Sequence, residues 1–414
     1  MAVKQTSEAA ENQLHKHKHR ALADDLRGLG RLAVDATRGI VNLIEAMHHN
    51  IARIPGTTAS RRDGRTAGIS GMVYRSVHGA TQAFGSGIDS ALAMLAPYLG
   101  GMADRPEREH LQAALNGVLG DHLCASGNPL TIPMQLRRDG RPLPLNAQAL
   151  SEEIPDATGK IVVLVHGLCM NDRQWRRLRE DGDSHDHGIA LQNECGYAAV
   201  YLHYNTGLAI SENGLALAGL LETLTAQWPV ALEELVIIAH SMGGLVSRSA
   251  HHQARQSDLV WSKRLDKMIF LGTPHHGAPL ERGGHWLDLV LGAMPYAAPF
   301  AKIGRIRSAG ITGLRHGHLL DDRQEPIPLP EDIRCYTVAG HVGTQQAALH
   351  AKYLGDGLVP LDSALGRHPD AARHLDFPAD RQAVLALTNH MQLLSDAGAY
   401  EAIKRFTIGS PLPV

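Results

Sequence analysis

The chain has 414 residues, of which 44% are hydrophobic, and its 40 lysines and arginines nearly balance its 42 aspartates and glutamates. This length exceeds that of a typical single domain, so we expect one large domain with an appendage. The balanced charge gives no electrostatic reason to expect a nucleic acid as a partner. The four cysteines form no Cys-x-x-Cys pair, which argues against a disulfide framework or a cysteine zinc site.

The polar amino terminus argues against export. No apolar segment follows the basic run at residues 15–20, as a secretory signal would require. A membrane-spanning helix needs roughly 20 consecutive apolar residues, and the sequence contains no such stretch. We therefore expect a soluble, cytoplasmic protein.

Three helical patterns precede the first strand pattern. They cover residues 21–54, 69–99 and 106–123, and apolar residues recur in each at helical intervals. We expect an amino-terminal helical region over residues 1–125 that packs on itself or caps the rest of the chain. The alternative is peripheral contact with a lipid or polymer-granule surface, which amphipathic helices can provide.

Residues 126–414 alternate between strand and helix patterns. Asp139 and Gly140 form a turn signal between residues 131–136 and 142–145, which predicts a β-hairpin. Further strands are expected at residues 161–165, 198–202, 235–239, 267–271 and 333–339, and a helix at 215–228. Strands that alternate with helices predict an α/β fold, with a mostly parallel sheet covered by helices on both faces.

Residues 275–330 interrupt this alternation. The segment contains glycines, prolines and an apolar stretch at residues 286–300 that has no evident place in a sheet. An insertion of this length after a strand is typical of a lid over a binding cleft. A rigid insertion that does not move as a lid fits the same pattern.

The sequence Ala-His-Ser-Met-Gly-Gly at residues 239–244 follows an apolar strand pattern. The small residues Ala239 and Gly243 flank Ser241 and allow a tight turn from the strand into the following helix. A serine in such a strand–turn–helix setting presents its hydroxyl at the carboxyl edge of the sheet. The segment resembles the nucleophile elbow of the α/β-hydrolases, with Ala239 in place of the usual first glycine.

A serine nucleophile needs a base to accept its proton and an acid to orient that base. In the α/β-hydrolases the acid and then the histidine follow the serine along the chain. Asp356 lies between two glycines after the strand at 333–339, and His390 follows an apolar run near the carboxyl terminus. We select these two; the competing residues are Asp362 for the acid and His341, His368 and His374 for the base.

Two backbone amides are expected to stabilise the oxyanion. The first belongs to Met242, directly after the nucleophile at the start of a helix. The second is expected from the loop after the strand at 161–165, where Gly167 permits close approach to Ser241 and Leu168 supplies the N–H.

A metal site is an alternative use of the histidines. His185 and His187 could combine with His275 and His276, but their spacing matches no helical i, i+4 pair of ligands. We therefore expect no metal and no cofactor.

Five segments together resemble the bacterial lipase and esterase branch of the α/β-hydrolase superfamily. They are His-Gly-Leu at 166–168, Ala-His-Ser-Met-Gly-Gly at 239–244, Gly-Thr-Pro-His-His-Gly at 272–277, Gly-Asp-Gly-Leu-Val-Pro at 355–360 and Asn-His at 389–390. The third and fourth are also similar to segments of the inositol-deacylase-like group. The resemblance covers about residues 130–405, and the residues before it match no family that we can assign.

The resemblance implies a serine carboxylic-ester hydrolase that acts through Ser241, Asp356, His390 and an acyl-enzyme. Its expected partner is a small-molecule or lipid ester with an apolar acyl group. A thioesterase, an acyltransferase or an intracellular polyester depolymerase would use the same three residues. A non-catalytic binding protein with a hydrolase fold is the remaining alternative, and the sequence predicts neither the oligomeric state nor the natural substrate.

Overall fold

The computed structural model describes residues 106–179, 182–277, 308–320, 326–343 and 355–409. Almost all of them belong to one compact unit, formed by Glu109–Cys124 and Thr131–Val414. The predicted helices at residues 21–54 and 69–99 lie outside the described residues. The amino-terminal helical region and the predicted division at residue 125 therefore stay predictions.

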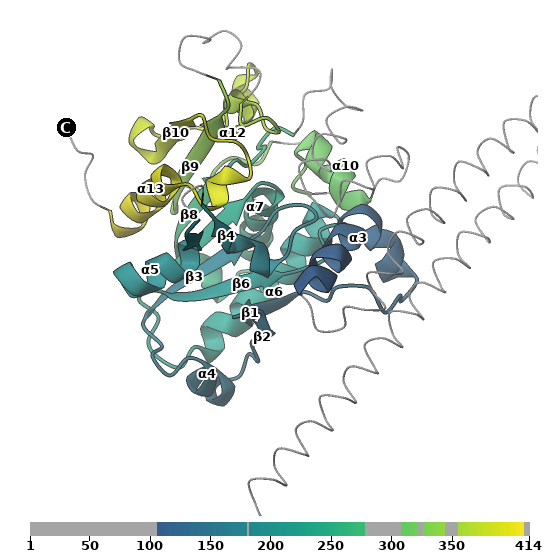
Figure 1. Cartoon of the computed structure of the whole chain (residues 1–414), viewed down its shortest axis with the longest axis vertical. Coiled ribbons are helices and arrows are strands. Elements are labelled where there is room, and N and C mark those ends of the chain that lie inside the picture. Colours follow the sequence, from purple (N-terminus) through teal and green to yellow (C-terminus); the bar gives the residue numbers. More distant parts are fainter. Residues whose placement is uncertain (1–105, 180–181, 278–307, 321–325, 344–354, 410–414) are drawn as a thin grey trace, which may run out of the picture. The chain divides into compact units, whose positions relative to one another are not determined.

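Within the described residues, eight strands form one sheet in the order β10-β9-β8-β7-β3-β6-β1-β2 (Figure 1). The strands are β1 (Gln135–Arg138), β2 (Arg141–Pro142), β3 (Lys160–Val165), β6 (Ala198–His203), β7 (Glu234–His240), β8 (Leu265–Leu271), β9 (Arg334–His341) and β10 (Gln382–Ala386). All neighbours from β10 to β6 are parallel, and the hairpin of β1 and β2 joins β6 antiparallel. The short strands β4 (Arg177–Leu178) and β5 (Ser184–His185) pair separately.

The central strands consist of apolar, often β-branched residues because both faces of the sheet are covered. All residues of β3 after Lys160 are buried, as are all residues of β7 after Glu234. The predicted α/β fold with a mostly parallel sheet is confirmed. The hairpin is also present, with shorter strands than the sequence pattern suggested, since β2 contains only Arg141 and Pro142.

Two groups of helices flank the sheet. The helices are α3 (Pro106–Ala125), α4 (Ala147–Glu153), α5 (His187–Cys195), α6 (Ile210–Gln227), α7 (Met242–Gln256), α10 (Ala309–His316), α12 (Leu361–Ala364) and α13 (Ala397–Ile408). Short 3₁₀ helices lie at Asp172–Trp175, Val260–Lys263, Ala371–Arg373, Ala379–Arg381 and Gln392–Leu394. The crossovers through α5 and α6 run in opposite directions along the sheet, so right-handed connections place these helices on opposite faces. Helix α7 packs with α6, and α13 contacts α5, which covers both faces as predicted.

Helix α3 confirms the third predicted helix, and its residues Glu109–Cys124 belong to the same unit as the sheet. Asn205 donates a hydrogen bond of 2.9 Å to the Gly120 carbonyl. The buried Arg137 of β1 bridges Glu109 of α3, at 3.3 Å, and Asp172, at 3.2 Å. Burial alone would raise the pKa of Asp172, but the hydrogen bond from His203 and the charge of Arg137 hold it below its ordinary value.

The insertion after β8 is described in part. Ser308 caps α10 by accepting a hydrogen bond from the Ile311 amide, and its hydroxyl donates to the Gly117 carbonyl of α3 at 2.7 Å. These contacts fix the described part of the insertion against the main unit. Mobility of the segment as a lid stays a prediction.

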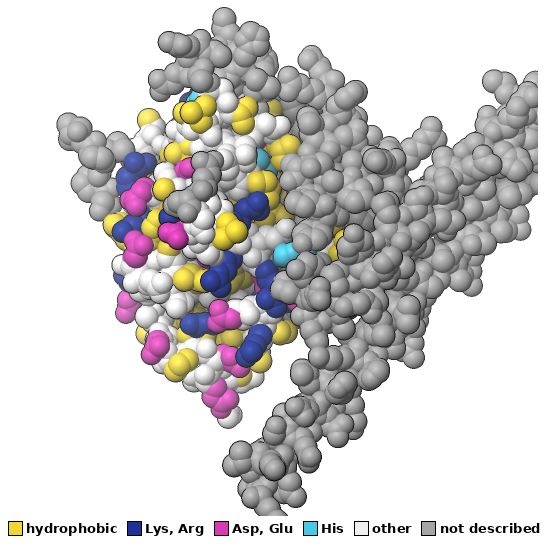
Figure 2. Space-filling view, viewed as in Figure 1, with side chains coloured by type: hydrophobic (Ala, Val, Ile, Leu, Met, Phe, Trp, Pro, Cys, Tyr) yellow, Lys and Arg dark blue, Asp and Glu magenta, His cyan; other side chains and the backbone are white. Residues whose placement is uncertain are grey.

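The described surface in Figure 2 carries lysines and arginines interspersed with aspartates and glutamates, and neither sign forms a continuous patch on that part of the face. No helix among the described residues is long and apolar enough to span a bilayer. The parallel strands β3, β7, β8, β9 and β10 all end at one edge of the sheet. In open α/β sheets, ligands bind outside this carboxyl edge.

Candidate active site

Ser241 occupies the turn between β7 and α7. Its backbone has φ 54° and ψ −124°, a conformation that non-glycine residues rarely adopt. The Ser241 amide donates to the Leu271 carbonyl at 2.9 Å, which ties the turn to the end of β8. The serine therefore lies at a strained strand-to-helix turn, as expected for a nucleophile elbow.

The turn is possible only because small residues surround it. A Cβ on Gly243 would lie 2.5 Å from the Val165 carbonyl oxygen and 2.7 Å from that of His166. A Cβ on Gly244 would lie 2.1 Å from the Thr273 hydroxyl. Helix α7 thus starts in direct contact with the ends of β3 and β8.

Asp356 and His390 form a buried pair. His390 Nδ1 lies 2.6 Å from Asp356 Oδ2, and the His390 amide donates to the Asp356 carbonyl at 3.0 Å. The other carboxylate oxygen accepts hydrogen bonds from the amides of Leu358, at 3.0 Å, and Val359, at 2.8 Å. Since the carboxylate accepts the proton of Nδ1, Nε2 is left as the basic nitrogen of the ring.

The chain brings this pair to the end of β8, next to the serine turn. A Cβ on Gly272 would lie 2.9 Å from Asp356 Oδ2 and 3.0 Å from His390 Nδ1. Gly272 directly follows Leu271, whose carbonyl holds Ser241. Ser241 Oγ makes no hydrogen bond with a side chain among the described residues, a common state for a catalytic serine before substrate binds.

His240 adds a contact that the sequence reasoning missed. Its ring centroid lies 4.5 Å from that of His390, and its Nε2 lies 3.1 Å from the His390 carbonyl. Burial, followed by the neighbouring His390, lowers the pKa of His240 well below 6.5. A neutral His240 therefore packs against His390 and holds its loop in place. The only sign of this role in the sequence is the position of His240 directly before Ser241.

A second contact chain that was missed starts at Arg179. Arg179 donates to His185 Nδ1 at 2.8 Å, His185 Nε2 lies 2.8 Å from His187 Nδ1, and His187 Nε2 lies 2.9 Å from the Leu393 carbonyl. Arginine can only donate, so each ring accepts at Nδ1 and donates at Nε2. Burial lowers the pKa of His185 to about 4 and that of His187 to about 3, which keeps both rings neutral. The chain ends three residues after His390 and holds its loop in place.

The two predicted oxyanion donors lie beside the serine. A Cβ on Gly167 would lie 3.0 Å from the Ser241 Cβ, so the 166–170 loop approaches the nucleophile closely. In this loop the Cys169 amide donates to Thr206 Oγ1 and the Met170 amide to the Gly167 carbonyl. The Leu168 and Met242 amides donate to no described residue, so both are available to a ligand.

Cys169 is the nearest competing nucleophile in this loop. Its side chain is buried, and burial raises the pKa of its thiol to about 12. The sulfur contacts the Ala114 carbonyl of α3 at 3.8 Å. A protonated, buried thiol of this kind is a packing residue.

None of the rivals for acid and base forms a comparable buried pair among the described residues. Asp362 is in α12 and faces Arg367 at 3.9 Å, with both side chains partly exposed. His368 and His374 lie together in an exposed loop, and the backbone carbonyl of His341 accepts from Thr388. Among the described residues, only His390 is paired with a buried carboxylate at the serine turn.

The alternative metal grouping is not formed by the described residues. His185 and His187 bond to each other, whereas His275 faces Arg248 at 3.3 Å. No group of three or more potential metal ligands occurs in the part of the chain that the structure describes.

Comparisons with known proteins find one family model and several solved structures that are similar to this chain. A family model described as a PGAP1-like alpha/beta domain matches residues 156–337. Among solved structures, the lipase BlEst2 of Bacillus licheniformis is 20% identical, with 67% of this chain and 96% of that chain covered and a TM-score of 0.39. An esterase from Thermogutta terrifontis is 15% identical, with 61% of this chain and 91% of that chain covered and a TM-score of 0.37.

A thioesterase domain, that of NocB, is 15% identical, with 61% of this chain and 96% of that chain covered and a TM-score of 0.35. A search of curated proteins finds no match. The strand order, the strained serine turn and the matching family model together identify the fold. The chain has the α/β-hydrolase fold, and its residues 156–337 are similar to the PGAP1-like alpha/beta domain family.

Proposed function

We propose that the protein is a serine carboxylic-ester hydrolase of the lipase or carboxylesterase type. One observation carries the proposal: a buried carboxylate and histidine, 2.6 Å apart, lie at the same corner of the sheet as a serine with φ 54°. A carboxylate fixes the imidazole tautomer and stabilises the imidazolium that forms when the serine is deprotonated. His203 and Asp172 form another buried pair, 3.0 Å apart, so it is the position beside the strained Ser241 turn that distinguishes His390 and Asp356.

In the first half-reaction, Ser241 Oγ attacks the acyl carbonyl carbon while His390 Nε2 accepts the hydroxyl proton. The carbonyl oxygen becomes an oxyanion and accepts hydrogen bonds from the Leu168 and Met242 amides. The bond from carbon to the alcohol oxygen then breaks, and His390 returns its proton to the departing alcohol.

In the second half-reaction, water attacks the acyl-enzyme. His390 accepts a proton from the water, and the oxyanion forms again beside the same two amides. The bond to Ser241 Oγ breaks, His390 protonates the serine, and the carboxylic acid leaves. The reaction needs no cofactor.

The local electrostatics favour the negative charge that develops. Met242 is the first residue of α7, so its amide lies at the positive end of the helix dipole. Asp356 is 2% exposed and receives two backbone hydrogen bonds besides that of His390. Donors fixed before the reaction stabilise the transition state without reorganisation.

The acyl group and the leaving group define the test. Purified wild type, Ser241→Ala and the matched control Ser151→Ala, an exposed serine of α4, are assayed with p-nitrophenyl esters of increasing acyl length. A parallel assay uses acyl thioesters, which separate an esterase from a thioesterase. We expect Ser241→Ala to lose about 10⁴-fold or more of the ester hydrolysis, and Ser151→Ala to retain it.

Circular dichroism and thermal unfolding show whether each variant is folded. Wild-type activity in a folded Ser241→Ala variant would refute the proposal. Hydrolysis of thioesters alone would replace the esterase by a thioesterase that uses the same residues.

A further inference from the structure

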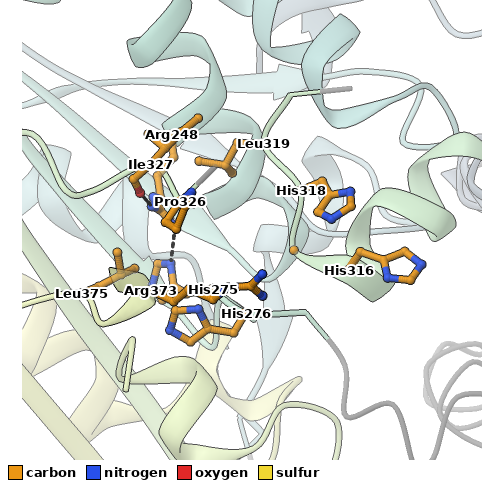
Figure 3. Close-up of a pocket in the computed structure, with 11 residues that line it drawn as sticks. Arg248, His275, His276, His316, His318, Leu319, Pro326, Ile327, Arg373 and Leu375 are labelled. Atoms are coloured by element: carbon orange, nitrogen blue, oxygen red, sulfur yellow. Dashed lines mark hydrogen bonds between the residues drawn. The ribbon is translucent and has the colours of Figure 1, made fainter. Parts of the chain in front are cut away.

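A second polar site lies beside His275 and His276, in the turn whose first residue, Gly272, lies next to the Asp356–His390 pair. It is a pocket of about 70 Å³ between α7, the turn at residues 272–277, α10 and the segment at 326–327. Figure 3 shows how side chains from these separate elements surround it. Its basic lining residues are Arg248, His275, His276, His316, His318 and Arg373. No acidic side chain is among the described residues that line it.

Arg248 is the central group of this pocket. The residue is 5% exposed, and its guanidinium donates to the Ile327 carbonyl and to His275 Nδ1 (Figure 3). Its Nε is buried and has no hydrogen-bond partner in the part of the chain that the structure describes. Burial lowers the pKa of Arg248 to about 10, which leaves the group charged at neutral pH. A buried guanidinium without a carboxylate among its described partners lacks the counter-charge that such groups normally have.

His275 supplies a second unused donor. Because arginine can only donate, the contact from Arg248 requires an unprotonated Nδ1 on His275. Burial, followed by the charge of Arg248, lowers the pKa of His275 well below 6.5, so the ring is neutral. Its single proton therefore resides on Nε2, which is buried and has no partner among the described residues.

These two donors select the class of ligand. A metal ion would be repelled by Arg248 and would meet a protonated His275 Nε2. An oxyanion instead accepts from a guanidinium and an N–H at once. Arg373 at the margin is a further cation, although it also faces Asp370 at 3.9 Å. We propose that Arg248 and His275 form a binding site for an oxyanion, the phosphate or carboxylate group of a ligand, separate from Ser241.

The distance to the active site allows two sources for this group. His275 is three residues after Gly272, so their Cα atoms are at most about 11 Å apart. The anionic group could belong to a free anion or to an ester substrate whose acyl carbonyl reaches Ser241. The second source rests on the proposed hydrolase function, whereas the site itself does not.

Inorganic phosphate is the first probe. Binding to the full-length protein is measured by isothermal titration calorimetry and by the thermal unfolding midpoint, against sodium chloride at equal ionic strength. The variants are Arg248→Met, the half-exposed marginal Arg373→Met, and the control Arg255→Met, which lies on α7 with a 44% exposed side chain facing Asp332. We expect saturable binding that weakens by about tenfold or more in Arg248→Met, weakens less in Arg373→Met and is unchanged in Arg255→Met.

A second arm identifies the source of the anion. Phosphate that raises the KM of a carboxylate-bearing ester but not that of a neutral ester would assign the site to substrate. If phosphate binds but changes neither KM, the site is assigned to a free anion. If phosphate binds to a protein that shows no esterase activity, the anion site is upheld and the hydrolase function is refuted. The proposal is overturned by wild-type protein that binds phosphate no better than chloride. It is equally overturned if folded Arg248→Met and Arg373→Met both bind phosphate as wild type does.

Discussion

Two histidine clusters lie at opposite ends of the turn at residues 272–277, and they differ in the charge of their partner. At one end, Gly272 touches His390, whose Nδ1 is bonded to the Asp356 carboxylate. At the other end, His275 accepts a hydrogen bond from the Arg248 guanidinium. A negative partner stabilises a protonated ring, and a positive partner opposes it.

The same side chain therefore serves opposite purposes in the two clusters. Beside Asp356, the ring can accept a proton at Nε2 during a reaction. Beside Arg248, the ring stays neutral and presents an N–H at Nε2. The partner on Nδ1, more than the histidine itself, determines whether the free nitrogen acts as a base or as a donor.

The largest expected effect comes from removing the negative partner. Asp356→Asn retains the size of the side chain but can donate to His390 Nδ1, which favours the wrong tautomer. We expect kcat for ester hydrolysis to fall by about 10³–10⁴-fold, measured with the ester that wild type hydrolyses best. The control is Asp362→Asn, because Asp362 is the competing acid of the sequence pattern and its partly exposed side chain faces Arg367 at 3.9 Å.

An unchanged kcat in Asp356→Asn would mean that the charge of the partner on Nδ1 does not determine the role of the histidine. A large loss of kcat in Asp362→Asn, together with a normal kcat in Asp356→Asn, would make Asp362 the acid that orients His390.

A smaller effect is expected on the free energy of unfolding. It tests whether the start of α7, directly after Ser241, packs closely against the end of β3. Gly243→Ala places a Cβ 2.5 Å from the Val165 carbonyl oxygen, which belongs to the sheet and cannot move aside. We expect it to reduce the free energy of unfolding by about 1–3 kcal/mol or more. Gly219→Ala on α6 is the matched control, since a Cβ there would have no atom of the described residues within 4 Å. This substitution should raise stability by about 0.5–1 kcal/mol.

Urea unfolding followed by circular dichroism measures both variants. Equal stability of Gly243→Ala and wild type would mean that the turn has room that the structure does not show.

The last effect concerns pH, and it involves buried histidines whose rings stay neutral in the folded chain. Burial lowers the pKa of His166 and His187 from 6.5 to about 3. The unfolded chain takes up a proton at each near pH 6.5, whereas the folded chain cannot, so stability is complete above that pH and falls below it. Each ring should cost about 1.4 kcal/mol of unfolding free energy per pH unit below 6.5, down to about 3.

The free energy of unfolding is measured at pH 7.5, 6.0 and 5.0. A His166→Asn variant should show a shallower decline than wild type, because one such ring is gone. A free energy that stays flat between pH 7.5 and 5.0 would contradict the burial of neutral rings.

The fold was predictable from local patterns. Apolar runs such as residues 235–239 are long enough to identify buried strands, and Ser241 follows one of them next to small residues. The strand ends differ by one or two residues, because pairing in the sheet extends β8 to Leu265 and β9 to His341. The hairpin prediction was correct in place and too long in extent.

The support around the site was not predictable, because it depends on contacts between distant residues. Nothing in the sequence indicates that His187 bonds to the Leu393 carbonyl, 206 residues later. The pairing of Arg248 with His275 likewise requires the positions of α7 and the turn after β8. The hydrogen bond from Asn205 to the Gly120 carbonyl of α3 is a further contact between residues far apart in the sequence. Polar side chains that contact another element follow no periodic pattern in the sequence, so such contacts cannot be predicted from periodicity.

The most direct test of the central claim is covalent labelling of the nucleophile. Wild type, Ser241→Ala and His390→Ala are treated with a fluorophosphonate probe, and the modified peptide is identified by mass spectrometry. We predict an adduct on Ser241 in wild type, none in Ser241→Ala, and labelling slowed by orders of magnitude in folded His390→Ala. An adduct on another residue, or labelling of Ser241 that proceeds equally fast without His390, would contradict it.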